Sequence, residues 1–387
     1  MLSHRRSNAQ PGSRVPLPRL VGLDLGACGI RAVEAVQRRD GYVITRAAQM
    51  DLPDGWILNG VVLEPESVAR ALRRLWRTGH FTTRRVAVAI TDTAVITRQL
   101  ELPWMPPDDF RAALRYQVAD SLPVDLAAVE LDYQPLAEYQ VADQHGQTMD
   151  MLEFLLVAAN TEQLRAVADV ILRARLEPVA QDTSAFALIR SATGGVLTGD
   201  SELRAIVDIG ADALTVVVHQ GGRPRFIRAM PNQGGALAIR TLSEALDMTT
   251  SQATDQMWKT GLNGPPPIAT PVAESSVFGV LSSTQDVSID PLAKRTLAVI
   301  NPWATSLVGA IRDSLDYFAA TGRKEPVQRL DLAGRASTLP GLAERIGTEL
   351  RIPVAHVDPF ASVKRAHRVR RASSAALGVA TGLAMGA

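Results

Sequence analysis

The chain has 387 residues, a formal net charge of +1 at pH 7 and a hydrophobic content of 46%, which is typical of a globular protein. This length is enough for two or three domain-sized cores, and the balanced charge does not indicate nucleic acid as the main partner. The single cysteine, Cys28, excludes an internal disulfide framework and suits a reducing cytoplasm. No apolar run reaches the roughly 18 residues of a membrane span, and the N-terminus lacks the apolar stretch of a signal peptide.

The first 90 residues predict a short arm followed by a β-rich unit. Residues 1–19 are basic and rich in Ser and Pro, so we expect a disordered arm. Three strand-like runs follow, "RLVGLDL", "IRAVEAVQ" and "YVITRAAQ", with short glycine-containing separators that favour an antiparallel meander. The stretch "EPESVARALRRLWRTGH" places apolar residues on one helical face, and "RRVAVAI" is typical of a buried strand.

Residues 84–178 form a block with its own strand and helix signals. "AVITRQLELP", "VELDYQPL" and "MLEFLLVAA" are typical of strands, whereas "PPDDFRAALRYQVADSL" predicts a helix with Pro and Asp at its start. A second helix, "TEQLRAVADVILRARL", closes the block. We interpret Asp108 and Asp109 as charges that stabilise the start of their helix, not as an acid/base pair.

The second half repeats the beginning of the first. "RAIVDIG" is a strand that ends in Asp208-Ile209-Gly210, and "ALTVVVHQGGRPRFIRAMP" predicts a hairpin that turns at two glycines. The first half has the same order, with Asp24-Leu25-Gly26 after its first strand. Two copies of one strand–turn–strand unit indicate a duplicated α/β fold with two lobes around a cleft.

The later segments complete the expected domain plan. A mobile loop rich in Pro and Ser, a long helix from about Pro291, a strand–turn–helix unit and a packed C-terminal helix follow in order. The predicted units are the arm (1–19), the first lobe (20–83 and 179–203), an inserted subdomain (84–178), the second lobe (204–371) with its mobile loop (261–288), and a C-terminal helix (372–387) that returns to the first lobe.

The two Asp-x-Gly turns carry the candidate chemistry. At each turn a strand delivers a carboxylate beside glycines, whose backbone N–H groups can approach an anion. Asp24 and Asp208 would then face one another across the cleft and hold a hydrated Mg²⁺, while Arg31 could pair with phosphate oxygens. The histidines show no metal-ligand spacing, and no Ser/His/Asp or Cys/His nucleophile arrangement is present. We therefore predict a phosphate-binding cleft without assigning catalytic residues.

The chain resembles the actin-like ATPase superfamily, and more narrowly the PilM family of type IV pilus assembly proteins. The resemblance lies in "VGLDLGACGIRAVE", "LPDGWILNGVV", "LELPWMPPDDFRAALRYQVADSLPVDLAAVELDYQPL", "AIVDIGADALTVVV" and "LAGRASTLPGLAERIGTELRIPV". It implies an actin-like, ribonuclease H-like duplicated fold with an inserted subdomain of the FtsA type. It also implies a nucleotide site, with ATP and Mg²⁺ as the ligands.

The residues that the resemblance assigns to this nucleotide site depart from the family pattern. Ala27 replaces a hydroxyl residue, Arg31 replaces a lysine, Thr254 and Met257 stand at the acidic and basic ribose-side places, and Arg335 follows Gly334. We therefore expect reduced ATP binding and little or no turnover. The nucleotide-binding residues, if ATP binds, are Asp24, Gly26, Ala27, Cys28, Gly29, Arg31, Asp208, Gly210, Gly234, Gly235, Gly334 and Arg335, with Asp24 and Asp208 also serving the metal through water.

The resemblance also implies a partner and a location. Proteins of this family bind the short cytoplasmic tail of the inner-membrane protein PilN, beneath PilO and PilP, so we expect a cytoplasmic scaffold that reaches the inner membrane through PilN. The expected groove lies between the inserted subdomain and the first half, where strand edges suit an extended peptide. Self-association remains open. The alternatives are an active actin-like ATPase and a cytoplasmic component of a type II secretion system; the latter normally continues into a membrane span.

Overall fold

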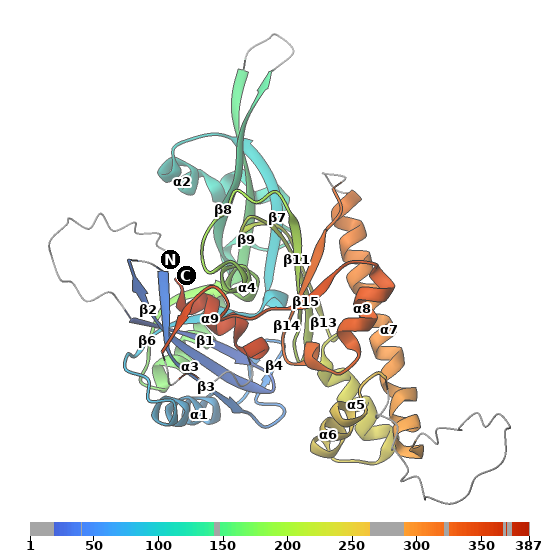
Figure 1. The fold of residues 1–387 in the computed structure, drawn as a ribbon. Coiled ribbons are helices and arrows are strands. Elements are labelled where there is room, and N and C mark those ends of the chain that lie inside the picture. The colour runs from blue at the N-terminus through green and yellow to red at the C-terminus, as the bar shows by residue number, and fades with distance from the viewer. Residues whose placement is uncertain are drawn as a thin grey trace, which may run out of the picture.

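The computed structural model describes residues 19–39, 41–142, 148–263, 290–320, 325–366, 369 and 374–386. The expected disordered arm and most of the expected mobile loop lie outside these residues, although Arg19 already begins the first strand. Two lobes lie side by side, and a smaller sheet with one helix lies above the lobe that contains the N-terminal strands (Figure 1). No helix among the described residues is long and apolar enough to cross a membrane.

The first lobe is built on a six-stranded sheet with the order β10-β6-β1-β2-β3-β16. Strands β1, β2 and β3 form the predicted antiparallel meander, and β6 and β10 join it in parallel to β1. The first turn is tight, so Asp24 lies opposite Arg31 and Gly26 opposite Gly29. The strands are β1 (Arg19–Gly26), β2 (Gly29–Arg38), β3 (Gly41–Asp51), β6 (Arg85–Ile90), β10 (Glu177–Thr183) and β16 (Lys364–Arg365).

The second lobe repeats this plan in a five-stranded sheet with the order β13-β12-β11-β14-β15. Asp208 lies opposite Thr215, as Asp24 lies opposite Arg31 in the first sheet. The predicted duplication is therefore confirmed at the level of strand order and register. The strands are β11 (Leu203–Ile209), β12 (Ala213–Gln220), β13 (Arg223–Pro231), β14 (Arg329–Ala333) and β15 (Val354–His356).

Helices cover both faces of the first sheet. On one face α1 (Pro65–Thr78) and α3 (Thr161–Arg173) bury Val68, Leu72 and Ile171 against the strands. On the other face α4 (Ser184–Thr193) and α9 (Gly378–Ala384) pack together and against the sheet. The described residues of the C-terminal segment therefore form a buried helix that packs on the first lobe. A short hairpin, β4 (Ile57–Leu58) and β5 (Val61–Val62), extends from the lobe toward the cleft.

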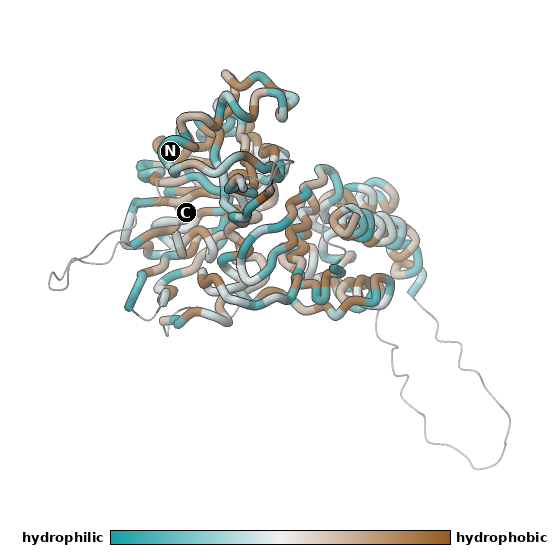
Figure 2. Tube along the Cα trace, turned by 90° about the horizontal axis from the view of Figure 1, so that it is seen from above, coloured by the Kyte–Doolittle hydropathy of each residue, from teal (hydrophilic) through white to brown (hydrophobic). Residues whose placement is uncertain are grey.

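The second lobe has its own apolar core, which includes Trp303, Leu307 and Met257. Hydrophobic segments run through the interior of both lobes when the molecule is viewed from above (Figure 2). Helix α7 crosses the lobe and contains Pro302, which removes one backbone donor inside the helix. The helices are α5 (Gly235–Leu246), α6 (Thr250–Thr260), α7 (Pro291–Ala320) and α8 (Leu342–Leu350).

The inserted subdomain is smaller than the block we expected. A three-stranded sheet, β7-β9-β8, packs against α2 around Phe110 and Phe154, whose rings meet edge to face. In contrast, β6 and α3 lie within 84–178 but pack into the first lobe. We therefore propose residues 95–160 as the inserted subdomain. Its elements are β7 (Val95–Pro103), α2 (Pro107–Gln117), β8 (Val129–Ala142) and β9 (Thr148–Asn160).

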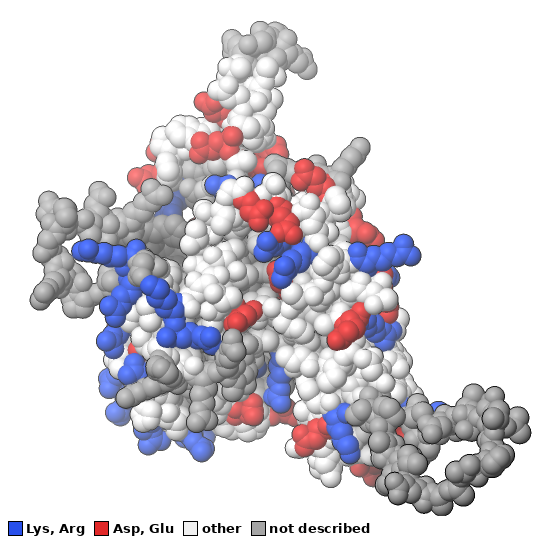
Figure 3. Space-filling model, viewed as in Figure 1, with Lys and Arg blue, Asp and Glu red and all other residues white. Residues whose placement is uncertain are grey.

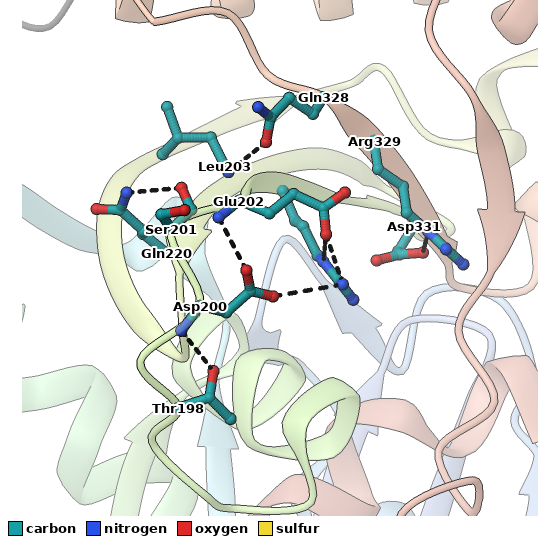
Figure 4. Close-up of polar contacts among 10 residues, drawn as sticks. Thr198, Asp200, Ser201, Glu202, Leu203, Gln220, Gln328, Arg329 and Asp331 are labelled. Atoms are coloured by element: carbon teal, nitrogen blue, oxygen red, sulfur yellow. Dashed lines mark hydrogen bonds and ion pairs between the residues drawn. The ribbon is translucent and has the colours of Figure 1, made fainter.

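Residues 198–204 connect the two lobes. A polar network fastens this connecting segment to the strands of the second sheet (Figure 4). Gln220 donates to the carbonyl oxygen of Ser201, Gln328 accepts from the amide of Leu203, and Arg204 pairs with Glu202. The amide of Thr198 donates to the carbonyl oxygen of Gly221 at 2.9 Å. A Cβ at Gly221 would lie 2.4 Å from the Thr198 oxygen, so glycine is required at this contact.

Candidate functional site

The cleft between the lobes is a cavity of about 670 Å³. The β1–β2 turn, the β4–β5 hairpin, the β11–β12 turn, the start of α5, α6 and the turn after β14 all line it. Of the predicted nucleotide-site residues, the cleft brings together Asp24, Gly26, Ala27, Cys28, Arg31, Asp208, Gly210, Gly235, Gly334 and Arg335. Gly29 lines an adjoining cavity of about 640 Å³, and Gly234 lines neither of these two cavities.

Glycine is needed where the turns of the second lobe approach each other. A Cβ at Gly334, which has a φ of +81°, would lie 2.4 Å from the Asp208 carboxylate. A Cβ at Gly234 would lie 2.1 Å from the carbonyl oxygen of Ala211. The amide of Gly235 donates to the carbonyl oxygen of Gly210 at 3.0 Å. The glycines thus let the β11–β12 turn, the start of α5 and the turn after β14 pack closely.

Arg31 is already paired within the protein. Its Nη1 lies 3.0 Å from Oδ2 of Asp24, and both side chains are 17% exposed. The same Nη1 lies 2.9 Å from the position that a Cβ of Gly26 would occupy, so the guanidinium covers the turn. Asp24 therefore has an internal cation at the carboxylate expected to face Mg²⁺. For the same reason Arg31 is not free to pair with phosphate.

Asp208 lies near this ion pair, and no cation among the described residues forms an ion pair with it. Burial and the Asp24 carboxylate raise the pKa of Asp208 to about 6, although Arg31 opposes the shift. Asp24 and Asp208 thus line the same cleft, and their carboxylates interact electrostatically. Among the residues that the structure describes, no group of three or more His, Cys, Asp or Glu side chains could hold a metal ion.

Asp92 is an important carboxylate that the sequence analysis missed. It follows β6 in a short 3₁₀ turn (Asp92–Ala94), is 7% exposed, and accepts a hydrogen bond from the Ala185 amide at 3.1 Å. Burial raises the pKa of Asp92 to about 7, and the carboxylates of Asp208 and Asp182 add to the shift. An Asp near the end of a buried strand was the available signal, because Asp24 and Asp208 stand at the ends of β1 and β11 and Asp92 follows β6 by two residues.

The base and ribose side of the cleft is occupied by protein side chains. The Arg335 guanidinium lies 5.8 Å from the ring centroid of Trp258, in cation–π geometry, and 3.7 Å from Asp51 of the first lobe. Thr254 donates its hydroxyl to the carbonyl oxygen of Thr250, and Met257 is fully buried in the core. Neither Thr254 nor Met257 supplies the charged group expected beside a ribose.

The lobes contact each other directly across the cleft. The backbone amide of Asn59 in the β4–β5 hairpin donates to the Asp212 carboxylate of the β11–β12 turn at 2.9 Å. The Asp51–Arg335 ion pair forms a second contact between the lobes. Burial, followed by the charges of Asp54 and Asp212, raises the pKa of the Cys28 thiol, which suits a turn-filling residue better than a reactive one.

These side chains fit a Mg²⁺–nucleotide poorly. The phosphate-side arginine is bonded to the metal-side aspartate, no hydroxyl stands at Ala27, and Arg335 is engaged by Trp258 and Asp51. The cleft and its glycine turns are retained, whereas the charges that would recognise ATP are satisfied within the protein.

Comparison with known structures identifies the class of fold. The chain is similar to a PilM–PilN type IV pilus biogenesis complex (TM-score 0.77, 22% identity, 96% of this chain and 98% of that chain covered). It is also similar to the ethanolamine utilization protein EutJ from Carboxydothermus hydrogenoformans (TM-score 0.54, 14% identity, 97% and 92% covered). A third relative is MreB5 of Spiroplasma citri bound to AMPPNP (TM-score 0.51, 10% identity, 94% of each chain covered). The fold is actin-like, as predicted.

Comparison of the sequence with protein-family models identifies the family. The model of the type IV pilus assembly protein PilM family matches residues 22–265 and 293–387. The chain belongs to this family. The expected family and fold class are therefore confirmed.

Proposed function

We propose that this protein is a cytoplasmic, actin-like scaffold of type IV pilus assembly that binds the N-terminal cytoplasmic tail of an inner-membrane PilN. The observation that carries the proposal is the family match across nearly all of the described chain. A PilM–PilN type IV pilus biogenesis complex is among the similar structures, which supports PilN as the partner. Through PilN the protein would lie beneath PilO and PilP, at the inner membrane.

The inserted subdomain offers the means of binding an extended peptide. Strands β7 and β8 are the outer strands of their sheet, and β10 is the end strand of the first sheet. Each therefore has a row of backbone N–H and C=O groups that no neighbouring strand pairs. Such edges bind an extended peptide through main-chain hydrogen bonds, and nearby apolar side chains provide selectivity.

We place the peptide groove where α3 and β10 meet the inserted subdomain. Asn160 ends β9 and caps α3 by accepting from the amides of Glu162 and Gln163. The Gln181 side chain on β10 donates to the carbonyl oxygen of Leu164 at 2.8 Å, which fastens β10 to the first turn of α3. Leu164 is half-buried at this junction and is our candidate apolar contact for the tail.

The proposal is tested by co-purification with PilN from the same genome and by titration of its labelled N-terminal tail. Leu164→Glu should weaken tail binding by at least about tenfold, because a charge would replace a buried apolar anchor. Leu172→Glu is the matched control, since this leucine lies on the last turn of the same helix and is 58% exposed. Equal loss in both variants, or no binding by the wild type, would reject this groove.

A further inference from the structure

The end of the first sheet that points away from the cleft is strongly basic. Strands β1, β6 and β10 begin at this end, while Asp24 and Gly26 at the other end of β1 line the cleft. Strand β2 ends here, and the short β16 pairs with the first half of β3 beside it. Six exposed arginines from these elements and their flanking turns form what we call the basic end: Arg38, Arg39, Arg84, Arg85, Arg175 and Arg365.

The basic end is poorly neutralised by acidic side chains. Glu177 is the exposed carboxylate beside Arg85 in the strand register, and the sequence adds Asp40 in the β2–β3 turn. None of the six arginines forms an ion pair with a residue that the structure describes. In contrast, Arg31, Arg46 and Arg190 elsewhere in the first lobe are all paired with carboxylates. Figure 3 shows this gathering of Lys and Arg over the outer end of the first lobe.

Charge of one sign, gathered from several elements at one end of a sheet and left unpaired, indicates a partner that carries many negative charges. We propose that the basic end binds the anionic headgroup surface of a lipid bilayer. This inference goes beyond the proposed function, because it assigns a direct membrane contact that does not depend on a protein partner.

Two observations favour a lipid surface over nucleic acid. Binding to single strands or loops uses exposed aromatic rings for base stacking. The large exposed aromatic side chains of the described chain are Trp104, Tyr116 and Tyr317, and these lie in the inserted subdomain and on α7. Among the exposed large apolar side chains of the described residues, the one nearest in sequence to the basic end is instead aliphatic: Leu172, three residues before Arg175, is 58% exposed.

The position of the N-terminal segment agrees with this assignment. Residues 1–18 join the structure at Arg19, the first residue of β1, and therefore at the basic end. By sequence they carry Arg5, Arg6 and Arg14 and no acidic residue. The attractions of several cations to an anionic leaflet add together. The arginines of residues 1–18 and those of the basic end would therefore hold the protein on a membrane better than either set alone.

The test is vesicle flotation of the full-length protein at low salt, with phosphatidylcholine vesicles containing or lacking phosphatidylglycerol. The wild type should bind only the anionic vesicles, and added salt should release it. The pair Arg84→Glu and Arg85→Glu should reduce binding by about tenfold or more, because each cation near the surface contributes to the attraction. The matched control is Arg223→Glu with Arg228→Glu, two exposed arginines on β13 of the second lobe.

The outcomes separate the possibilities. Equal loss in the control pair, binding to neutral vesicles, or no vesicle binding overturns the proposal. It is also overturned if Arg5→Ser, Arg6→Ser and Arg14→Ser together abolish binding while the Arg84 and Arg85 variant retains it. Salt-sensitive binding of a labelled DNA duplex without vesicle binding would assign the surface to nucleic acid. Titration of the PilN tail on the same variants should be unchanged, so failure here is distinguishable from failure of the proposed function.

Discussion

The two matching turns of this duplicated fold differ in how they neutralise the same carboxylate. In the first lobe Asp24 lies opposite Arg31 across the β1–β2 pair and forms an ion pair with it. In the second lobe Asp208 lies opposite Thr215, and burial together with the Asp24 carboxylate raises its pKa. The backbone register is the same, so the difference comes from one side chain.

This comparison shows how an actin-like cleft can keep its architecture while losing its ligand set. A guanidinium held by Asp24 supplies positive charge at the turn and removes the need for a bound cation there. Asp208 depends on the same guanidinium, because Arg31 opposes the rise in its pKa. Arg31 therefore stabilises both turns, and the cleft is electrostatically satisfied without a nucleotide.

The largest expected effect comes from Arg31→Thr, which copies the second turn into the first. Asp24 and Asp208 would then face each other without a cation. Because the pair is only 17% exposed, we expect a loss of about 2–3 kcal/mol in the free energy of unfolding, between the values for surface and buried pairs. Urea unfolding of the wild type and of Arg31→Thr at pH 7.5 measures this loss.

The loss should be smaller at pH 5, because Asp208, with a pKa of about 6, is then largely protonated. The double variant with Asp24→Asn is the control, since it removes the carboxylate that Arg31 neutralises and should recover most of the stability. If Arg31→Thr is as stable as the wild type at pH 7.5, the ion pair does not hold the cleft together.

A smaller effect of opposite sign is expected for Asp92→Asn. Burial raises the folded-state pKa of Asp92 to about 7, so the folded protein binds a proton more tightly than the unfolded chain. Stability therefore falls as pH rises from about 4 to about 7. Asparagine keeps an oxygen for the Ala185 amide and carries no charge, so the variant should gain about 1–3 kcal/mol at pH 8.

Urea unfolding of the wild type and of Asp92→Asn, at pH 5 and at pH 8, tests this prediction. The measured quantity is the gain in the free energy of unfolding that the substitution gives at each pH. The gain should be clearly smaller at pH 5 than at pH 8, because only part of the fall in wild-type stability between about pH 4 and about pH 7 has occurred at pH 5. Thermal unfolding of Asp182→Asn is a useful contrast, because Asp182 is paired with Arg190 and its loss should destabilise. A less stable Asp92→Asn protein at pH 8 would mean that the carboxylate is ionised and needed.

The strand–Asp–turn repeat was readable from the sequence because apolar runs and glycine positions set strand register locally. The Asp24–Arg31 pair was also within reach, since a tight turn between Gly26 and Gly29 places these residues opposite each other. It was missed because the glycine-containing turn was interpreted as a phosphate site, and Arg31 was therefore assigned to phosphate oxygens. The role of Asp92 and the proposed extent of the inserted subdomain depend on tertiary packing, because an apolar run such as β6 does not indicate which sheet it joins.

His219 extends the comparison to the far ends of the two sheets. It lies opposite Arg204, whereas the matching position in the first sheet is the small Ala35, opposite Leu20. Burial, opposed by Asp331 and assisted by Arg204, lowers the pKa of His219 to about 4, and its ring nitrogens have no hydrogen-bond partner among the described residues. Protonation therefore favours unfolding, and stability should fall as pH drops from about 6.5 to about 4.

His219→Leu should remove this acid-sensitive contribution. We expect a gain of about 1 kcal/mol at pH 5, because an unpartnered polar ring is replaced by an apolar side chain of similar size. The gain should be smaller at pH 8, where the wild-type ring is neutral in both the folded and unfolded states. Thermal unfolding across this pH range is the measurement, and a variant that is less stable at every pH would show that the ring has a partner in solution.

The smallest expected change is in nucleotide chemistry. For turnover, Asp24 and Asp208 would have to act together on Mg²⁺ and phosphate. Asp24 is instead paired with Arg31. Arg335 is likewise engaged by Trp258 and Asp51. We therefore expect a steady-state ATPase rate near background, unchanged by Asp208→Ala, and weak binding of a fluorescent ATP analogue that Asp24→Ala alters little. PilN-tail binding should likewise respond to Leu164→Glu far more than to Asp24→Ala. A clear ATPase rate abolished by Asp208→Ala would mean that the two turns still work as a pair, and that nucleotide, not peptide binding alone, controls this protein.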